Sequence, residues 1–388
     1  MIYVGIDVAK DKHDCFIVNS CGEVLRDVFT ITNDKKGFIA LLEAIPEVDN
    51  DKIKVGLEST GHYSLNLLNF LSANNFQIIV LNPLQTNLFR KAHTLRKSKT
   101  DKIDAKIIAQ MIMTGNFKTY SSLSYHLEEL KSLTRHKYRL KGNLSKYRIS
   151  LIRILDISFP ELESLVYSLN QKSTLALLKA YPSKEELASA HLTSLTNLLK
   201  KNSKGRYSRD KALQIREAAK DSIGTSSRAT SFELLQTISF IELYTEEIGK
   251  IDKEIKLIMD QIQSPIISIP GISYGLGSII LAEIGDIKNF ESPARLLAFA
   301  GLEPSIHQSG SYNATQSRMV KRGSPYLRWA LLHAARLVSM KDDTFKAYSE
   351  KKRAEGKHYY VVLSHLARKL VRVIHHLLTY DLEFIPQS

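Results

Sequence analysis

Four carboxylates near the start of the chain have the types and spacing that could do chemistry: Asp7, Glu58, Asp101 and Asp104. Asp7 and Glu58 each end an apolar run of strand length, whereas Asp101 and Asp104 share one turn of a helical pattern. Acids brought within about 4 Å repel by about 4 kcal/mol per pair at an effective dielectric near 20, so they need a cation. Hard oxygen ligands favour Mg²⁺, with Mn²⁺ as the other candidate.

The chemistry that such a cluster supports is phosphodiester displacement. Two metal ions about 3.5–4 Å apart can stabilise both the attacking and the leaving oxygen. The structural alternative makes Asp7 a strand-end residue, Glu58 a helix cap and the other two acids first-turn residues favoured by the helix dipole. A charge that ends a buried strand is costly without a function, which favours the metal site.

A basic segment precedes the last two acids. Residues 85–100 contain no acid and five cations, Arg90, Lys91, Arg96, Lys97 and Lys99. A solvated face is the usual meaning of such a run, but its position beside the predicted metal ligands favours a track for nucleic-acid phosphates. A second run, 131–153, holds eight Lys or Arg and no acid, an asymmetry that an ordinary helical arm would not need.

Two segments after residue 260 carry further candidates. Gly271 lies in a Pro-Gly turn before an apolar helical pattern, where backbone N–H groups could approach a phosphate. Ser309 precedes Gly310, and a serine there is usually a turn residue. As a nucleophile it would need a base, a metal or nearby cations. The cations in this segment are Arg318, Lys321 and Arg322.

The elements that must position these residues are predicted from hydrophobic periodicity. Strands are expected at 2–8, 13–19, 24–31, 53–57 and 77–81. A helix capped by Asn33 or Asp34 should run to about Ile45, and another should follow Gly61. Three strands joined by short turns and then a strand–helix–strand unit predict a mixed α/β sheet.

The rest of the chain reads as helical. Segments 123–158 and 230–262 predict long antiparallel helices or a coiled-coil arm, with shorter helices between them. Helices should also fill the C-terminal end. The predicted fold is therefore α/β plus all-α, with an α/β domain at 1–121, a helical coiled-coil domain at 122–262 and a mainly helical domain at 263–388.

Composition favours a nucleic-acid partner over a membrane. The formal net charge is +14, and no apolar run approaches the roughly 20 residues of a membrane span. We see no signal peptide, which favours the cytoplasm. Cys15 and Cys21 are interpreted as ordinary small residues, without a disulfide or zinc site.

Six blocks of the sequence resemble a known family, the DEDD transposases of the insertion-sequence family IS-one-ten. The N-terminal blocks are 5–10, 58–63 and 99–105, and the C-terminal blocks are 269–272 with 283–286, 300–304, and 321–323 to 326–328. They occur in the family's order and leave only the helical middle unmatched.

The resemblance implies a RuvC-like (RNase H-like) N-terminal domain and a C-terminal transposase domain. Independently of it, the Pro-Gly turn at Gly271 and the apolar helical pattern after it predict a helix–hairpin–helix-like element. It implies a bacterial or archaeal, nucleoid-associated recombinase that acts on donor and target double-stranded DNA under the guidance of a structured bridge RNA. The four acids would bind Mg²⁺, and Ser309 would form a covalent phosphoserine link. Because Ser311, Tyr312 and Asn313 replace the family's usual continuation, Ser311 stays a second candidate.

We compare three hypotheses for the function of this protein. The first is the guided recombinase, for which synapsis of two DNA partners predicts a homodimer or homotetramer. The second is a RuvC-like junction nuclease that acts by hydrolysis without the serine, and the third is a nucleic-acid-binding protein without catalysis. The four intact acids argue against the third, and the elaborate C-terminal domain argues against the second.

Overall fold

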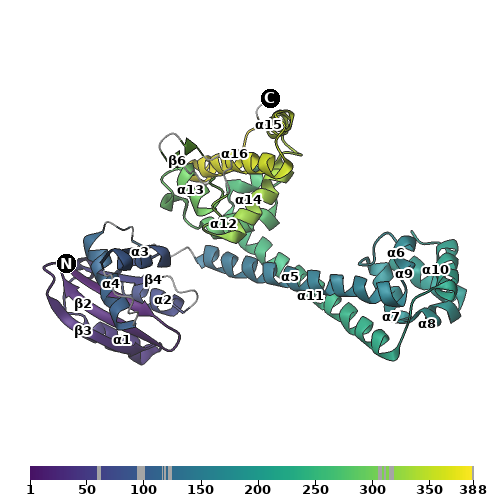
Figure 1. Ribbon diagram of the computed structural model, residues 1–388, viewed down its shortest axis with the longest axis horizontal. Coiled ribbons are helices and arrows are strands. Elements are labelled where there is room, and N and C mark those ends of the chain that lie inside the picture. The colour runs from purple at the N-terminus through teal and green to yellow at the C-terminus, as the bar shows by residue number, and fades with distance from the viewer. Residues whose placement is uncertain are drawn as a thin grey trace. The chain divides into compact units, whose positions relative to one another are not determined.

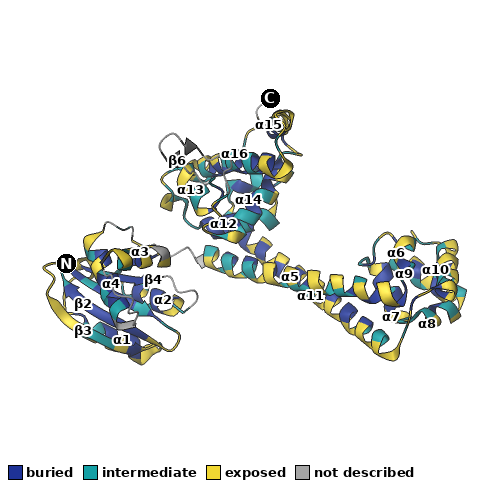
Figure 2. Cartoon of the chain, in the orientation of Figure 1, coloured by how far each residue is buried: buried dark blue, intermediate teal, exposed yellow. Residues whose placement is uncertain are grey.

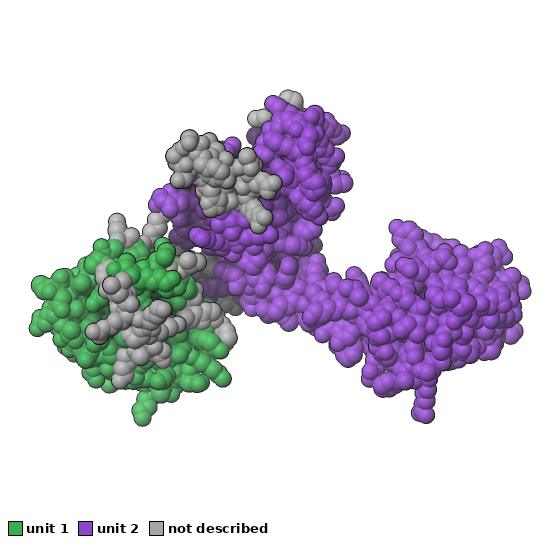
Figure 3. All heavy atoms as spheres, in the orientation of Figure 1, with its two compact units in different colours: residues 1–122 green, residues 123–388 purple. Residues whose placement is uncertain are grey.

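A computed structural model gives the fold of the chain. It describes residues 1–58, 63–93, 101–115, 117, 119–120, 125–304, 308–309, 312–313 and 319–386. Two compact units are formed by residues 1–122 and 123–388, and each is described by itself (Figure 3). The predicted division into three domains stays a prediction.

The first unit is built on a mixed five-stranded sheet, as the sequence predicted (Figure 1). Its strands are β1 (Ile2–Val8), β2 (Lys12–Asn19), β3 (Val24–Thr32), β4 (Ile53–Glu58) and β5 (Gln77–Leu81), in the order β3-β2-β1-β4-β5. The pairs β1–β2 and β2–β3 are antiparallel, whereas β1–β4 and β4–β5 are parallel. Two parallel central strands therefore end at the same edge of the sheet.

Helices connect and cover the strands. They are α1 (Lys35–Ala44), α2 (Leu65–Ala73), α3 (Pro83–His93) and α4 (Asp101–Thr114), with a short 3₁₀ helix η1 (Asn50–Lys52). Asp34 caps α1 by accepting a hydrogen bond from the backbone N–H of Gly37, so the predicted cap is confirmed for Asp34.

The two faces of the sheet differ in what covers them. Val4, Ile6 and Leu57 belong to a buried core shared with α1 and α2. Figure 2 colours the buried residues of the chain dark blue. The alternate face receives α4, which approaches β1 so closely at Gly5 that an added Cβ would lie 2.2 Å from the carbonyl oxygen of Ala105. The absence of a side chain at Gly5 therefore lets α4 pack closely on the sheet. This packing places the start of α4 near the ends of the strands.

Within the residues that the structure describes, the regular elements of the second unit are helices and two short strands. Its helices are α5 (Tyr125–Ser158), α6 (Leu162–Leu165), α7 (Lys172–Ala180), α8 (Lys184–Ser189), α9 (Leu192–Asn202), α10 (Arg209–Asp221), α11 (Arg228–Ile262), α12 (Tyr274–Ile284), α13 (Pro293–Phe299), α14 (Pro325–Val338), α15 (Asp343–Ala354) and α16 (Tyr359–Tyr380). The 3₁₀ helices η2 (Pro265–Ser268) and η3 (Ile287–Asn289) and the paired strands β6 (Gln308–Ser309) and β7 (Tyr312–Asn313) complete it.

The long helices α5 and α11 lie along each other, as predicted (Figure 1). Arg153 pairs with Glu233 and Lys137 pairs with Asp252, so residue numbers fall along one helix as they rise along the other. The helices are therefore antiparallel; the coiled-coil geometry stays a prediction. One hydrophobic cluster joins them to α6–α10, and another joins them to the C-terminal helices.

Two smaller findings bear on the composition. Among the described residues, no helix is long and apolar enough to cross a membrane. Cys15 is buried in the sheet and Cys21 is exposed in the turn after β2, and neither forms a disulfide.

Candidate functional site

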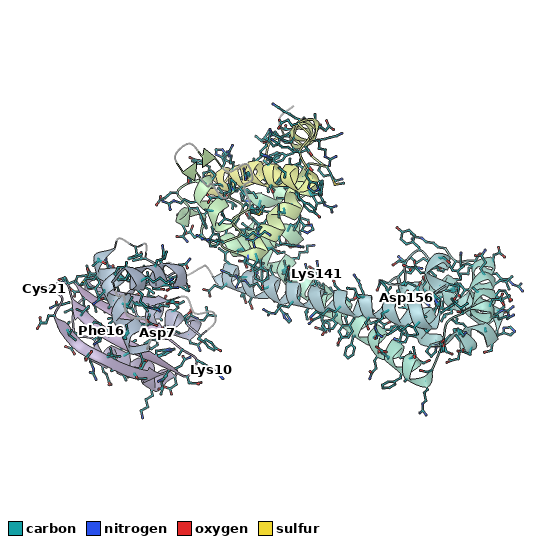
Figure 4. The ribbon with its side chains drawn as sticks, viewed as in Figure 1. Asp7, Lys10, Phe16, Cys21, Lys141 and Asp156 are labelled. Atoms are coloured by element: carbon teal, nitrogen blue, oxygen red, sulfur yellow. The ribbon has the colours of Figure 1, made fainter. Side chains whose placement is uncertain are left out.

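Asp7 and Glu58 end the adjacent parallel strands β1 and β4. The register pairs Ile6 with Leu57, so the two acids follow at the same level on neighbouring strands. Because side chains alternate along a strand and Ile6 and Leu57 lie in the core on one face, Asp7 and Glu58 project toward the other face. This is the face that α4 covers. Figure 4 labels Asp7 in the sheet.

Asp104 reaches the same face from α4. Asp104 is only 5% exposed, and the next residue, Ala105, packs against β1 at Gly5. Gly56 in β4 allows a similar approach, because an added Cβ would lie 2.8 Å from a side-chain carbon of Ile112. Asp101 begins α4, and its side chain lies outside what the structure describes.

Helix α3 contributes two residues that contact the acids. The Thr86 hydroxyl donates to Glu58 Oε2 at 3.0 Å, and Arg90 Nη2 lies 3.0 Å from Asp104 Oδ1. The sequence interpretation missed Thr86, although its spacing of four residues from Arg90 places both on one helix face. Arg90 was predicted to bind nucleic acid, and the structure gives it a carboxylate partner.

A further acid, Asp14, lies beside Asp7. The antiparallel register of β1 and β2 pairs these two residues directly, and Asp14 is 5% exposed. Its carboxylate accepts a hydrogen bond from the hydroxyl of Thr30 on β3. The signal that could have identified it is the register of the β1–β2 hairpin, because directly opposed residues share a face.

The donor set fits a hard divalent ion in its chemistry. Asp7, Glu58 and Asp104 supply carboxylate oxygens on one face at one edge of the sheet. Within the described residues, no group of three or more His, Cys, Asp or Glu side chains stands close enough together to hold a metal ion. The fit of this site to a divalent ion therefore rests on the carboxylate donors and on the face of the sheet that they share.

The other predicted cations of the first unit fall in two groups. Lys91 is exposed on α3, next to Arg90. Arg96, Lys97 and Lys99 lie outside the described residues. The phosphate track therefore stays a prediction.

In the second unit, hydrogen bonds hold together the two ends of the segment that carries the candidate serine. We call this part of the structure the base of the serine segment. Ser309 lies in β6, where it pairs with Tyr312 of β7, and its side chain is outside the description, as is the whole of Ser311. The backbone N–H of Val320 donates to Glu303, and that of Lys321 donates to Gly301.

Arg328 joins both sides of this base. Its guanidinium Nη1 donates to the carbonyl oxygens of Ala300, at 3.3 Å, and Lys321, at 3.2 Å. Gly323 has φ of +100°, and an added Cβ would lie 1.8 Å from the carbonyl oxygen of Phe299. The two ends of the serine segment are therefore held close together by hydrogen bonds at this base. Lys321 and Arg322 are exposed there, and Arg318 lies outside the described residues.

A buried acid anchors the end of this base. Glu283 of α12, whose side chain is 1% exposed, accepts two hydrogen bonds from Arg135 of α5, at 2.7 and 3.0 Å. It also accepts a hydrogen bond from Ser324, which caps α14. Burial raises the pKa of Glu283, but the hydrogen bonds from Arg135 and Ser324 outweigh burial and hold the pKa below its usual range.

The basic run at 131–153 has acidic partners elsewhere in the second unit. Arg135 pairs with Glu283, and Lys137 and Arg153 pair with acids of α11. The charge asymmetry seen in the sequence is therefore compensated in part by packing between helices, which was not foreseen.

Gly271 has a packing role in the structure. Its φ is +91°, and an added Cβ would lie 2.9 Å from the carbonyl carbon and oxygen of Leu337 at the end of α14. Both the backbone conformation and the close contact require glycine. A contact of Gly271 with nucleic acid stays a prediction.

The sheet order and the acids at the ends of its central parallel strands fit the RuvC-like class of domain. Residues 4–160 match a family model described as transposase, of the DEDD type of IS110, and residues 263–350 match one described as transposase IS116/IS110/IS902 family. The chain belongs to the IS110 (IS-one-ten) family of transposases, which cut and join DNA, and the resemblance seen in the sequence is confirmed. DEDD transposases typically use divalent metal ions.

Similar proteins extend along nearly the whole chain. An uncharacterized 44.8 kDa protein of insertion element IS116 from Streptomyces clavuligerus is 27% identical over 96% of this chain and 93% of its own length. A pilin gene-inverting protein of Moraxella lacunata is 24% identical over 96% of this chain and 94% of its own. A mini-circle putative transposase for IS117 from Streptomyces coelicolor is 24% identical, with 97% and 94% covered.

Proposed function

We propose that this transposase is an RNA-guided DNA recombinase in which Asp7, Glu58, Asp101 and Asp104 bind Mg²⁺ and Ser309 is the nucleophile. The observation that carries the metal site is the register of β1 and β4, which puts Asp7 and Glu58 on the face of the sheet that α4 and Asp104 cover. When bound, the divalent ions would polarise the scissile phosphate and neutralise its developing charge.

The serine step conserves the phosphodiester bond energy. Ser309 Oγ loses its proton and bonds to phosphorus, while the bond from phosphorus to the leaving sugar oxygen breaks and that oxygen gains a proton. Attack by a hydroxyl of the second DNA strand then reverses the sequence and releases the serine. Exposed Lys321 and Arg322, near the base of the same segment, would attract the phosphate.

Two observations support rejoining over hydrolysis. One relative is named for inverting a pilin gene, and an inversion needs both cut ends to be joined again. The two ends of the serine segment are also held together at its base, by the hydrogen bonds of Arg328 and the close packing of Gly323. A hydrolytic nuclease would need no such segment.

The guide RNA and the oligomer belong to the same proposal. The family implies a structured RNA, and the net charge of +14 suits a polyanionic partner. Binding two DNA partners favours a homodimer or homotetramer. The test is a mobility assay with the structured transcript from the end of the element, compared with a scrambled RNA of equal length. Equal affinity for both would contradict guidance.

The nucleophile is tested by trapping. Labelled DNA should form a protein adduct that survives denaturation, and Ser309→Ala should abolish the adduct while RNA binding stays intact. Ser311→Ala is the matched control and should retain it. An adduct lost only in Ser311→Ala would move the role to that residue. Metal-dependent cleavage without any adduct, leaving free 5′-phosphate ends, would instead establish a hydrolytic junction nuclease.

A further inference from the structure

Helix α3 contacts two of the proposed metal ligands at once. The Thr86 hydroxyl lies 3.0 Å from Glu58 Oε2 of β4 and equally far from the carbonyl oxygen of Pro83, so its single proton is shared between these two acceptors. Arg90, one turn further along, lies 3.0 Å from Asp104 of α4. Residues four apart lie on one face of a helix, so a single face of α3 bridges the sheet and α4.

Both contacts are shielded from solvent. Thr86 is 1% exposed, and the side chains of Arg90 and Asp104 are 18% and 7% exposed. Charges interact more strongly where water is excluded, so the Arg90–Asp104 pair is stronger than a surface ion pair. The two contacts differ in kind, because a hydroxyl orients a carboxylate without neutralising it, whereas a guanidinium neutralises it.

We propose that Thr86 and Arg90 are positioning residues with opposite effects on divalent-ion binding. Thr86 orients the Glu58 carboxylate and strengthens binding. Arg90 competes with the ion for the Asp104 carboxylate and weakens binding, while it stabilises the metal-free protein. This inference rests on the proposed metal role of Glu58 and Asp104.

The sign of the Arg90 effect follows from charge. Arg90 brings a full positive charge to Asp104 Oδ1, so an arriving cation must share or displace it. Loss of Arg90 leaves a buried carboxylate without its guanidinium partner, which destabilises the metal-free protein and favours any other cation. Loss of the Thr86 hydroxyl leaves Glu58 with one orienting donor fewer, and losses of this kind typically weaken metal binding 10–100-fold.

The experiment is a Mn²⁺ titration of the full chain, followed by electron paramagnetic resonance of the free ion. Arg90→Gln should bind Mn²⁺ about tenfold more tightly than wild type, the scale on which a neighbouring cation changes the proton affinity of a carboxylate. Thr86→Val should bind at least about tenfold more weakly, and Thr86→Ser should restore the wild-type affinity.

A matched control removes an ion pair away from the acids. Lys52 pairs with Asp49 at 2.8 Å just before β4, at the end of that strand opposite to Glu58, and both side chains are exposed. Lys52→Gln makes the same charge change as Arg90→Gln and should leave Mn²⁺ affinity unchanged.

The outcomes separate this inference from the proposed function. If wild type binds Mn²⁺ and Asp104→Asn weakens binding, but Arg90→Gln binds no more tightly than wild type, this inference is wrong and the metal site stands. If wild type binds no Mn²⁺, both are wrong. Should Arg90→Gln fail to fold, Arg90→Lys, which keeps the charge but loses the planar fork, should bind slightly more tightly than wild type. Weaker binding by Arg90→Lys would overturn the inference.

Discussion

Asp14 lies directly opposite Asp7 in the antiparallel pair of β1 and β2, so the two acids share the face of the sheet that α4 covers. Like charges in this position destabilise an antiparallel pair by up to about 1 kcal/mol. We expect these two charges to repel each other and a bound cation to relieve that repulsion.

The first prediction concerns this repulsion. Asp14→Asn removes one charge and keeps a carbonyl oxygen for the Thr30 hydroxyl. Without divalent ions, amide protons of β1 and β2 should exchange more slowly than in wild type by a factor of about 2–5, because the local opening free energy rises by up to about 1 kcal/mol. Hydrogen exchange measures this.

The control for that exchange measurement is Asp51→Asn, an exposed acid just before β4, which should leave the rates in β1 and β2 unchanged. Added Mn²⁺ should shrink the difference between Asp14→Asn and wild type. Faster exchange in the metal-free Asp14→Asn protein would show that the acids do not repel.

The second prediction tests the approach of α4 to the sheet. A Cβ at Gly5 would lie 2.2 Å from the Ala105 carbonyl oxygen and 2.5 Å from the Ala109 nitrogen, which are backbone atoms that cannot rotate away. Gly5→Ala should therefore destabilise the first unit by about 1–3 kcal/mol. It should also move Asp104 and reduce DNA cleavage.

Gly249→Ala is the matched control for Gly5→Ala. It lies inside α11 with nothing within 4 Å of an added Cβ, and it should stabilise that helix by up to about 1 kcal/mol. Thermal unfolding and cleavage rates measure both changes. A Gly5→Ala protein as stable and active as wild type would refute the close approach.

The sequence predicted the sheet well because strand and cap signals are local. The bounds of the five strands agree with the predicted ranges to within one residue, and Asp34 was recognised as a cap from its own neighbourhood. Asp14 was missed because its place beside Asp7 depends on the hairpin register, which no single strand specifies. The basic run around Arg90 indicated charge, but only tertiary packing decides that Arg90 faces Asp104.

The serine segment likewise combines features that the sequence shows with contacts that only the folded chain makes. Its glycines and cations are visible in the sequence, but the base is formed by residues distant from the serine. Arg328 reaches back to Ala300 and Lys321, and Gly323 packs on Phe299. Such contacts arise when α13 and α14 pack, and periodicity does not encode them.

The third prediction concerns Arg328. Hydrogen bonds from a charged donor contribute about 1.5–3 kcal/mol each, and Arg328→Met removes two of them from the base of the serine segment. Protease cleavage within 301–323 should become at least tenfold faster, and the yield of the protein–DNA adduct should fall. Arg336→Met, an exposed change in the last turn of α14, is the control and should alter neither. Unchanged proteolysis in Arg328→Met would contradict the role of this residue.

The last prediction uses the depressed pKa of Glu283. Because the folded pKa lies below the unfolded value of about 4.3, the stability from this carboxylate is fully present above that pH and is lost as pH falls through the folded pKa. At pH 7, Glu283→Gln should lose about 1–3 kcal/mol; this is less than for a fully buried pair, because the Arg135 side chain is 39% exposed.

Unfolding midpoints measured from pH 3 to 7 should therefore show the largest gap between wild type and Glu283→Gln at neutral pH and a shrinking gap below about pH 4.3. Glu254→Gln changes an exposed acid of α11 and should show no such convergence. A gap that stays constant with pH would mean that Glu283 contributes through packing alone. Convergence would show that its ionised form, held by Arg135 and Ser324, links α5, α12 and the start of α14.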